Sequence, residues 1–202
     1  EHVIENMELY GCDDGIVRGL VFCSRIEECR TLAQKFNERG IPSVALSGSN
    51  PESSREDAIK RLEADLEDSE KLDYVFTVDI FNEGVDIPKV NQIVMLRPTQ
   101  SAIIFVQQLG RGLRKLKERD KYLTVIDFIG NYQQNFLIPV ALFGDQTLEK
   151  DEIRRLMVGG NDLLPGMSTI DFDEIARQKI FDAVNQANLQ TAQELRKDYK
   201  SM

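Results

Sequence analysis

Apolar residues form five short runs along the chain, and the segments between these runs carry apolar positions at helical spacing. Polar residues are rare within the runs, which is typical of strands that are buried on both faces. Strand and helix signals alternate, and this alternation favours an α/β fold: a parallel sheet covered by helices on both faces. The predicted strands are residues 19–24, 43–47, 74–78, 92–96 and 122–128.

Two of the connecting segments have clear helix starts. Ser24 and Glu27 have the spacing of a capping box, so a helix should begin directly after the first strand. Asn50 and Pro51 suit the N-cap and first position of another helix, over about residues 52–66. Sheets of this kind bind ligands where the carboxyl ends of the strands lead into loops. Polar residues at those positions are therefore candidates for function.

The regular alternation stops in the last third of the chain. We therefore divide the chain into a lead-in segment (residues 1–17), an α/β domain (residues 18–130) and a C-terminal helical extension (residues 131–202). In the extension, Asp171 or Asp173 can cap a helix. The sequence of the extension by itself indicates no chemistry.

The composition is that of an ordinary globular chain, with 42% hydrophobic and 29% charged residues. No run is long enough to cross a membrane and the N-terminus lacks a signal pattern, so we expect no membrane partner. Glu1 is not an initiator methionine, and we expect a fragment of a longer polypeptide. The single histidine, His2, excludes histidine-based triads and most zinc centres. Three cysteines without metal-ligand spacing indicate core residues in a reducing, cytoplasmic compartment: Cys12, Cys23 and Cys29.

The charge limits the kind of nucleic-acid binding that the chain can support. A net charge of −9 argues against a general nucleic-acid coat, which would be basic. A narrow phosphate-binding strip remains possible, because backbone N–H groups and a few side chains at helix starts can build one. Polar residues do lie at or just after the ends of predicted strands, at Ser24, at Ser47 with Gly48, and from Thr77 onward.

Residues 106–116 carry two stripes if they form a helix. One stripe is apolar, and the other consists of Gln107, Arg111 and Arg114 at a spacing of four and three residues. Two guanidiniums one turn apart repel each other unless an anion lies between them, and each planar guanidinium can bind phosphate oxygens through two hydrogen bonds. A solvated basic helix face explains the same pattern and is the commoner case for an isolated helix.

Residues 77–88 form a second informative segment. Thr77 ends a predicted strand, and Gly84 permits close backbone approach just before Asp86. A carboxylate there can accept hydrogen bonds from a ribose, while Thr77 and nearby N–H groups can bind phosphate. Taken alone, the segment also fits a loop in which Asp86 caps a turn. Asp127 also has two candidate roles, because it can orient the arginines or cap a turn.

Together, these segments resemble the C-terminal motor half of superfamily-two helicases and translocases. Residues 20–24 are similar to the fourth motif of that family and residues 77–88 to the fifth, while residues 107–114 match the sixth, Gln-x-x-Gly-Arg-x-x-Arg. The resemblance covers residues 18–130 and implies a RecA-like domain. It is strongest to the branch of restriction-enzyme motor subunits, and weaker to the RNA-directed DEAD-box branch, whose sixth motif begins with His.

The resemblance implies roles for individual residues. Arg114 would be the arginine finger on the γ-phosphate, Arg111 a second phosphate contact, and Gln107 the residue that couples the nucleotide state to the cleft. The nucleotide-binding residues would be Gly84, Asp86 and Gly110. The residues that hold the backbone of one nucleic-acid strand would be Ser24, Arg25, Ser47, Gly48 and Thr77, with Arg55 as a weaker candidate. Each serine also fits an ordinary helix cap.

The chain departs from a complete motor, because it has no Gly-x-x-x-x-Gly-Lys-Ser/Thr loop and no Asp-Glu-x-His motif. ATP with Mg²⁺ would therefore bind mainly to a preceding RecA-like domain, and we predict that this chain alone hydrolyses ATP negligibly. The expected partners are that domain and nucleic acid, DNA rather than RNA. Two alternatives remain open. One is a non-catalytic nucleic-acid or protein interaction module that kept the fold. The other is a stand-alone doubly wound enzyme or nucleotide-binding protein, which would need a glycine-rich loop after the first strand.

Overall fold

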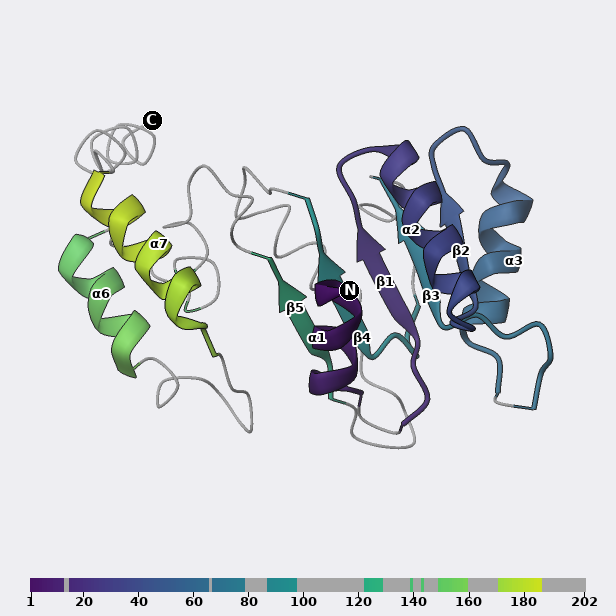
Figure 1. The fold of residues 1–202 in the computed structure, drawn as a ribbon, viewed down its shortest axis with the longest axis horizontal. Helices are drawn as coiled ribbons and strands as arrows, with labels where there is room; N and C mark the ends of the chain where they lie inside the picture. The colour runs from purple at the N-terminus through teal and green to yellow at the C-terminus, as the bar shows by residue number, and fades with distance from the viewer. Residues whose placement is uncertain are drawn as a thin grey trace, which may run out of the picture. The chain divides into compact units, whose positions relative to one another are not determined.

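The computed structural model of the protein describes residues 1–12, 15–65, 67–78, 87–97, 122–128, 139, 143, 149–159 and 171–186. The chain divides into two compact units, which are described separately below. Within the described residues, the first unit contains a sheet and three helices, and the second contains two further helices (Figure 1).

Five parallel strands form the sheet of the first unit, in the order β2-β3-β1-β4-β5 (Figure 1). Their carboxyl ends are in register, so one row of residues crosses the whole sheet. This row consists of Leu46, Thr77, Phe22, Met95 and Asp127. We call this side of the sheet the carboxyl edge and the opposite side the amino edge. The strands are β1 (Gly19–Phe22), β2 (Ser43–Leu46), β3 (Tyr74–Thr77), β4 (Gln92–Met95) and β5 (Thr124–Asp127).

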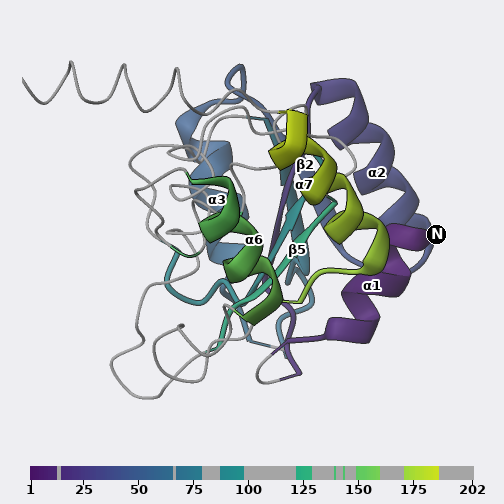
Figure 2. The ribbon, with the colours of Figure 1, turned by 90° about the vertical axis from the view of Figure 1, so that its left-hand side faces the viewer.

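Helices cover both faces of the sheet, as the sequence pattern predicted. Helices α1 (His2–Tyr10) and α2 (Ile26–Glu38) lie on one face, and α3 (Glu52–Leu62) lies on the other (Figure 2). On the first face, Phe36 of α2 packs edge-to-face against the rings of Tyr74 and Phe76, with centroids 5.6 and 4.9 Å apart. The buried cluster on this face consists of Met7, Val21, Cys23, Cys29, Ala33, Phe36, Tyr74, Phe76, Val94 and Ile126.

The start of α2 differs from the prediction. Arg25 occupies the N-cap in an extended conformation, and no side chain caps the helix, so the predicted capping box of Ser24 and Glu27 does not form. The physical reason is that the chain stays extended for one residue beyond Ser24, which moves the Ser24 hydroxyl away from the N-cap position. Instead, the Glu28 carboxylate accepts a hydrogen bond of 3.0 Å from the Ser24 N–H.

The three cysteines are free thiols, and two of them belong to the core, as predicted. A hydrogen bond between the thiols of Cys23 and Cys29, together with burial, holds the pKa of Cys23 well above its usual range. The same hydrogen bond lowers the pKa of Cys29. Cys12 is only half-buried. The reducing, cytoplasmic compartment stays a prediction.

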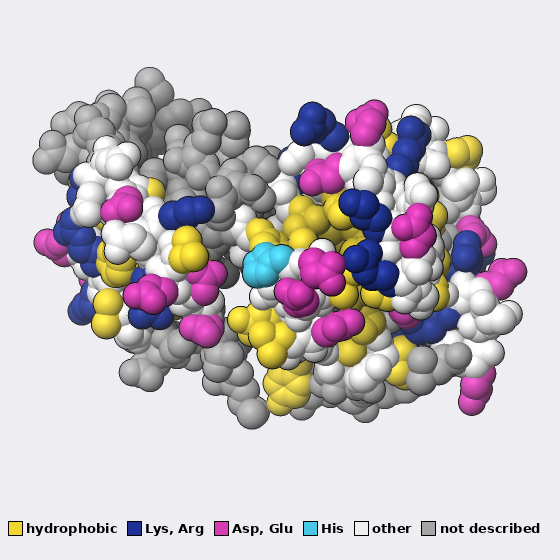
Figure 3. Space-filling model, in the orientation of Figure 1, with side chains coloured by type: hydrophobic (Ala, Val, Ile, Leu, Met, Phe, Trp, Pro, Cys, Tyr) yellow, Lys and Arg dark blue, Asp and Glu magenta, His cyan; other side chains and the backbone are white. Residues whose placement is uncertain are grey.

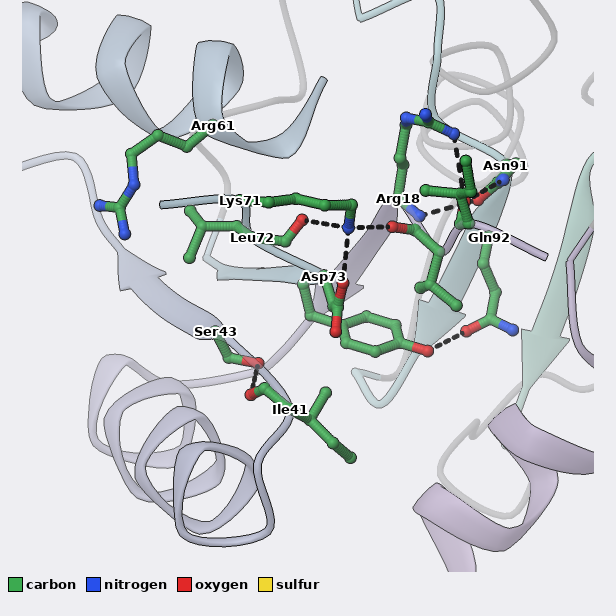
Figure 4. Close-up of polar contacts among 12 residues, drawn as sticks. Arg18, Ile41, Ser43, Arg61, Lys71, Leu72, Asp73, Asn91 and Gln92 are labelled. Atoms are coloured by element: carbon green, nitrogen blue, oxygen red, sulfur yellow. Dashed lines mark hydrogen bonds and ion pairs between the residues drawn. The ribbon is translucent and has the colours of Figure 1, made fainter. Parts of the chain in front are cut away.

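Figure 4 shows part of a polar network at the amino edge, and one residue of this network, Gln92, ties α1 to the sheet. Gln92 is fully buried and accepts a hydrogen bond of 2.8 Å from the Tyr74 hydroxyl. Its Nε2 donates to the carbonyl oxygens of Met7 at 3.1 Å and Gly11 at 2.8 Å, which end α1. Burial, with a smaller contribution from the charge of Asp73, holds the pKa of Tyr74 well above its usual range.

Lys71 forms a second part of the same network (Figure 4). Its buried ammonium donates to the carbonyl oxygens of Val17 at 3.0 Å and Leu72 at 3.1 Å, and to the carboxylate of Asp73 at 2.5 Å. All three donors of the ammonium are therefore used. Nearby, Asn91 accepts from the Arg18 N–H at 2.9 Å, so the chain that enters β1 is held against β4.

The second unit contains α6 (Lys150–Gly159) and α7 (Glu174–Gln186), which pack against each other. Helix α7 confirms the predicted cap, because the Ala176 N–H donates to the Asp173 carboxylate at 2.8 Å. The buried residues of α7 are Ala176, Ile180 and Val184, whereas Ile175 is 71% exposed. Helix α6 was not predicted individually, and the boundary at residue 131 stays a prediction. Among the described residues, no helix is long and apolar enough to span a membrane.

Candidate nucleic-acid interface

The register of the sheet brings together three segments that are far apart in the sequence. Strand β3 lies between β2 and β1, so Thr77 at its end has the residues that follow β2 on one side and those that follow β1 on the other. Neighbouring strands are about 4.8 Å apart. All the residues assigned to the nucleic-acid strip therefore lie along one stretch of the carboxyl edge: Ser24, Arg25, Ser47, Gly48 and Thr77.

Hydrogen bonds within the loop that follows β2 give it a defined turn. The Ser47 N–H donates to the Asn50 side-chain oxygen at 2.7 Å, and the Asn50 N–H donates back to the Ser47 carbonyl at 3.0 Å. The Ser47 hydroxyl also donates to Asn50, at 3.1 Å, and lies 2.8 Å from the Ser49 hydroxyl. Asn50 was predicted as the N-cap of α3, but Pro51 occupies that position. The prediction is wrong because the Asn50 side chain is turned back onto the loop.

Arg55 of α3 is hydrogen-bonded to the same loop. Its Nη2 donates to the carbonyl oxygens of Gly48 at 3.3 Å and Asn50 at 3.0 Å. Its Nε is buried and has no hydrogen-bond partner in the described part of the chain. The guanidinium is therefore directed into the loop, which differs from the outward-facing phosphate contact that the resemblance implied.

The segment that follows β1 is more open. Ser24 and Arg25 are exposed, and the Arg25 side chain forms no ion pair or hydrogen bond with another described residue. Arg25 lies at the N-terminus of α2, where the partial positive charge of the helix adds to that of the guanidinium. The Glu28 carboxylate already occupies the Ser24 N–H, so an anion that binds there has to displace it.

Thr77 is fully buried, in contrast to its neighbours on this edge. Its carbonyl accepts a hydrogen bond of 3.0 Å from the Cys23 N–H, but its hydroxyl has no hydrogen-bond partner among the residues that the structure describes. An unpaired buried hydroxyl costs about 1–3 kcal/mol, so it calls for a specific explanation. A bound phosphate oxygen would supply the missing acceptor.

The carboxyl edge also contains the topological switch point of the sheet. β1 and β4 are neighbours, yet the chain leads from β1 towards β2 on one side and from β4 towards β5 on the other. In open α/β sheets, ligands bind in the crevice that such a divergence creates. Arg97 follows β4 here and is half-buried. The sequence pattern did not single it out, although a basic residue directly after an apolar strand was a usable signal.

The surface over α1 and α2 gives no sign of a broad nucleic-acid track. On the face of the first unit that α1 and α2 cover, Lys and Arg side chains are interspersed with Asp and Glu (Figure 3). This mixture agrees with the net charge of −9. Binding of a nucleic-acid backbone would therefore depend on the local arrangement at the carboxyl edge.

The residues assigned to ATP lie outside the described residues, so their arrangement stays a prediction. They are Gly84, Asp86, Gln107, Gly110, Arg111 and Arg114. Asp127, at the end of β5, lies in the same row of the sheet as Thr77, and its carboxylate oxygens are buried. Its two candidate roles, orientation of the arginines or capping of a turn, both remain open.

Residues 5–115, more than half of the chain, match the family of helicase conserved C-terminal domains. The chain belongs to this family. The match extends through residues 107–114 and so includes the segment that carries both arginines. Membership confirms the resemblance on which the site assignments were based.

This helicase C-terminal domain is similar to parts of longer proteins. It is 26% identical over 162 residues to the putative ATP-dependent helicase IRC3 of Saccharomyces cerevisiae, covering 80% of this chain and 22% of that protein. It is 24% identical over 149 residues to the ATP-dependent RNA helicase SrmB of Haemophilus influenzae, covering 74% of this chain and 32% of that protein. The chain thus spans about a fifth to a third of the length of these relatives.

Solved structures confirm the RecA-like fold of the domain. The C-terminal part of the Fun30 ATPase domain has a TM-score of 0.52 at 12% identity, covering 90% of this chain and 53% of that one. A putative HsdR subunit of a type I restriction enzyme from Vibrio vulnificus YJ016 has a TM-score of 0.50 at 22% identity. This match covers 67% of this chain and 27% of that one. At these identities the likeness concerns the fold alone.

Proposed function

We propose that this chain is the second RecA-like domain of an ATP-dependent nucleic-acid helicase or translocase, and that its carboxyl edge binds the backbone of one strand. The observation that carries the proposal is the register that puts the polar residues after β1 and β2 beside the end of β3. Arg25, which follows β1, has an exposed side chain, and Thr77, which ends β3, has a buried hydroxyl without a partner among the described residues. Phosphate oxygens are the acceptors that both groups can use.

The test of this interface uses Arg25→Gln, with Arg39→Gln as the matched control. Arg25 precedes α2 at the carboxyl edge, whereas Arg39 follows the same helix at its other end and pairs with Glu1. Binding of a single-stranded oligonucleotide to the intact protein is measured over a series of salt concentrations. Arg25→Gln should weaken binding and lower the salt slope by about 0.7, the amount for one phosphate contact on a single strand. Equal effects of both substitutions would contradict a local site.

For the nucleotide, we propose that ATP with Mg²⁺ binds between this domain and a preceding RecA-like domain, which makes most of the contacts. Arg114 would stabilise the charge that develops on the γ-phosphate, with Arg111 as a second phosphate contact and Gln107 as the link to the cleft. Gly84, Asp86 and Gly110 would contact the nucleotide. The match of residues 77–88 and 107–114 to family motifs supports these roles.

The arginine finger is tested by Arg114→Ala in the intact protein, with Lys117→Ala as a control for a nearby basic residue outside the motif. Arg114→Ala should reduce nucleic-acid-stimulated ATPase activity by about a thousandfold or more, while nucleotide affinity changes little. Unchanged activity would favour a non-catalytic interaction module that keeps the fold. The 202-residue chain by itself should show negligible ATPase activity, and clear activity would overturn the division of the site between two domains.

We propose DNA rather than RNA as the track, because the sixth motif begins with Gln107 rather than with the histidine of the RNA-directed branch. The names of the relatives include an RNA helicase, so the choice needs a direct comparison. DNA and RNA oligonucleotides of the same length and sequence should be compared as activators of the ATPase. Stronger activation by RNA would contradict the proposal.

A further inference from the structure

Arg55 is a basic residue of the carboxyl edge whose Nη2 group donates hydrogen bonds to the protein itself. Its Nη2 donates to the carbonyl oxygens of Gly48 and Asn50, and no described carboxylate pairs with it. A guanidinium that served as a phosphate contact would direct these donors at the ligand. The geometry therefore indicates a role through the loop rather than on the nucleic acid.

The bond from Arg55 to the Gly48 carbonyl determines where the next N–H group points. In a trans peptide unit the C=O and the N–H point in opposite directions. Because the Gly48 carbonyl faces Arg55, the Ser49 N–H of the same peptide unit points away from it. The Ser49 N–H has no hydrogen-bond partner among the described residues, and Ser49 is exposed.

The turn itself orients a second N–H group in the same manner. The Ser47 carbonyl accepts the Asn50 N–H at 3.0 Å, so the Gly48 N–H of that peptide unit points out of the turn. Like that of Ser49, it has no hydrogen-bond partner in the described part of the chain. Consecutive N–H groups that face outward form a concave site that suits an anion.

We propose that Arg55 is a positioning residue. It holds the Gly48 carbonyl so that the Ser49 N–H faces the nucleic-acid backbone, beside the Gly48 N–H that the turn orients, and it does not contact phosphate itself. The inference rests on the proposed function of the carboxyl edge. It assigns to the backbone of this loop the contact that the resemblance would give to the arginine.

The test compares Arg55→Lys with Arg55→Gln in the intact protein. Lysine keeps the charge, but its side chain is one atom shorter and lacks the planar guanidinium, so it does not reach both carbonyls. Both variants should weaken binding of a single-stranded oligonucleotide by about fivefold to tenfold, because the loop then has to be ordered on binding. Both should keep the salt slope of the unsubstituted protein, whereas Arg25→Gln lowers it.

A second measurement separates loss of positioning from loss of folding. Amide hydrogen exchange without nucleic acid should show faster exchange at the Asn50 N–H in both Arg55 variants, with exchange in β2 and β3 unchanged. Near-normal binding by Arg55→Lys, together with a lower salt slope for Arg55→Gln, would show a direct phosphate contact and overturn the proposal. Unchanged binding by both variants would overturn it as well. If the unsubstituted protein binds no oligonucleotide, the result contradicts the proposed function of the carboxyl edge, on which the role of Arg55 rests.

Discussion

The two edges of the sheet use polar residues in opposite ways. At the amino edge, Gln92 and Lys71 are buried and bonded to backbone carbonyls and neighbouring side chains. At the carboxyl edge, the Thr77 hydroxyl and the Ser49 N–H have no hydrogen-bond partner within the described residues, and the Arg25 side chain is exposed. Both edges belong to the same five strands, so the difference lies in the loops and helices that surround them.

This difference indicates that polar residues at the amino edge stabilise the fold, whereas those at the carboxyl edge serve ligand binding. A buried polar group that has its partners adds little net cost and makes the packing more specific, whereas one without a partner is unfavourable until a ligand supplies it. Substitutions at the amino edge should therefore change the free energy of unfolding and leave nucleic-acid binding intact. Substitutions at the carboxyl edge should do the reverse.

The largest effect on stability is expected for Gly19→Ala at the amino end of β1. A Cβ at this position would overlap the ring of Tyr74, which is buried and hydrogen-bonded to Gln92 and so cannot move aside easily. The free energy of unfolding in urea should fall by about 3 kcal/mol. Gly159→Ala is the control, because a Cβ there meets nothing, and an equal loss in both variants would contradict the explanation.

Gln92→Leu should remove the tie between α1 and the sheet. It removes the partner of the Tyr74 hydroxyl and of the Gly11 carbonyl, while the Met7 carbonyl keeps its hydrogen bond from the Gly11 N–H. We expect the free energy of unfolding to fall by about 2 kcal/mol, with oligonucleotide affinity unchanged under conditions where the protein remains folded. A loss of affinity as large as that of the carboxyl-edge variants would remove the distinction between the edges.

Thr77→Val is the corresponding substitution at the carboxyl edge, where binding rather than stability should change. Valine has the same shape without the hydroxyl, which has no partner among the described residues. Stability should stay the same or rise by about 1 kcal/mol, while oligonucleotide affinity falls by about fivefold. Chemical unfolding and binding titrations on the same preparation check both expectations. Lower stability with unchanged affinity would mean that the hydroxyl serves the fold.

Tyr74→Phe should give the smallest change at neutral pH, a loss of about 1 kcal/mol from the hydrogen bond to Gln92. Burial raises the pKa of Tyr74 in the folded state, so its contribution is fully present below the usual tyrosine pKa of about 10. At higher pH the unfolded chain ionises first, and this contribution declines as the pH rises towards the folded value. Unfolding free energies from about pH 8 to about pH 11 should therefore converge for the two proteins, and a constant difference would contradict this account.

The sequence anticipated much of the sheet and little of the detail at its edges. All five strands and the cap of α7 by Asp173 follow from local patterns. The capping box of Ser24 and Glu27 and the cap at Asn50 were wrong, because each side chain had another available conformation that local spacing does not distinguish. The sequence did not predict α6 as a separate helix; its buried residues are Ile153, Leu156 and Met157, and it packs against α7.

The chain by itself determined the order of its elements and the motifs that place it among helicase C-terminal domains, because periodicity and spacing are local properties of a sequence. Only the tertiary structure decided that β3 lies between β2 and β1, and hence that Ser24, Ser47 and Thr77 share one edge. It also decided that Arg55 bonds to its own loop. Strand order and hydrogen-bond partners depend on contacts between residues distant in the chain, and no local pattern records them.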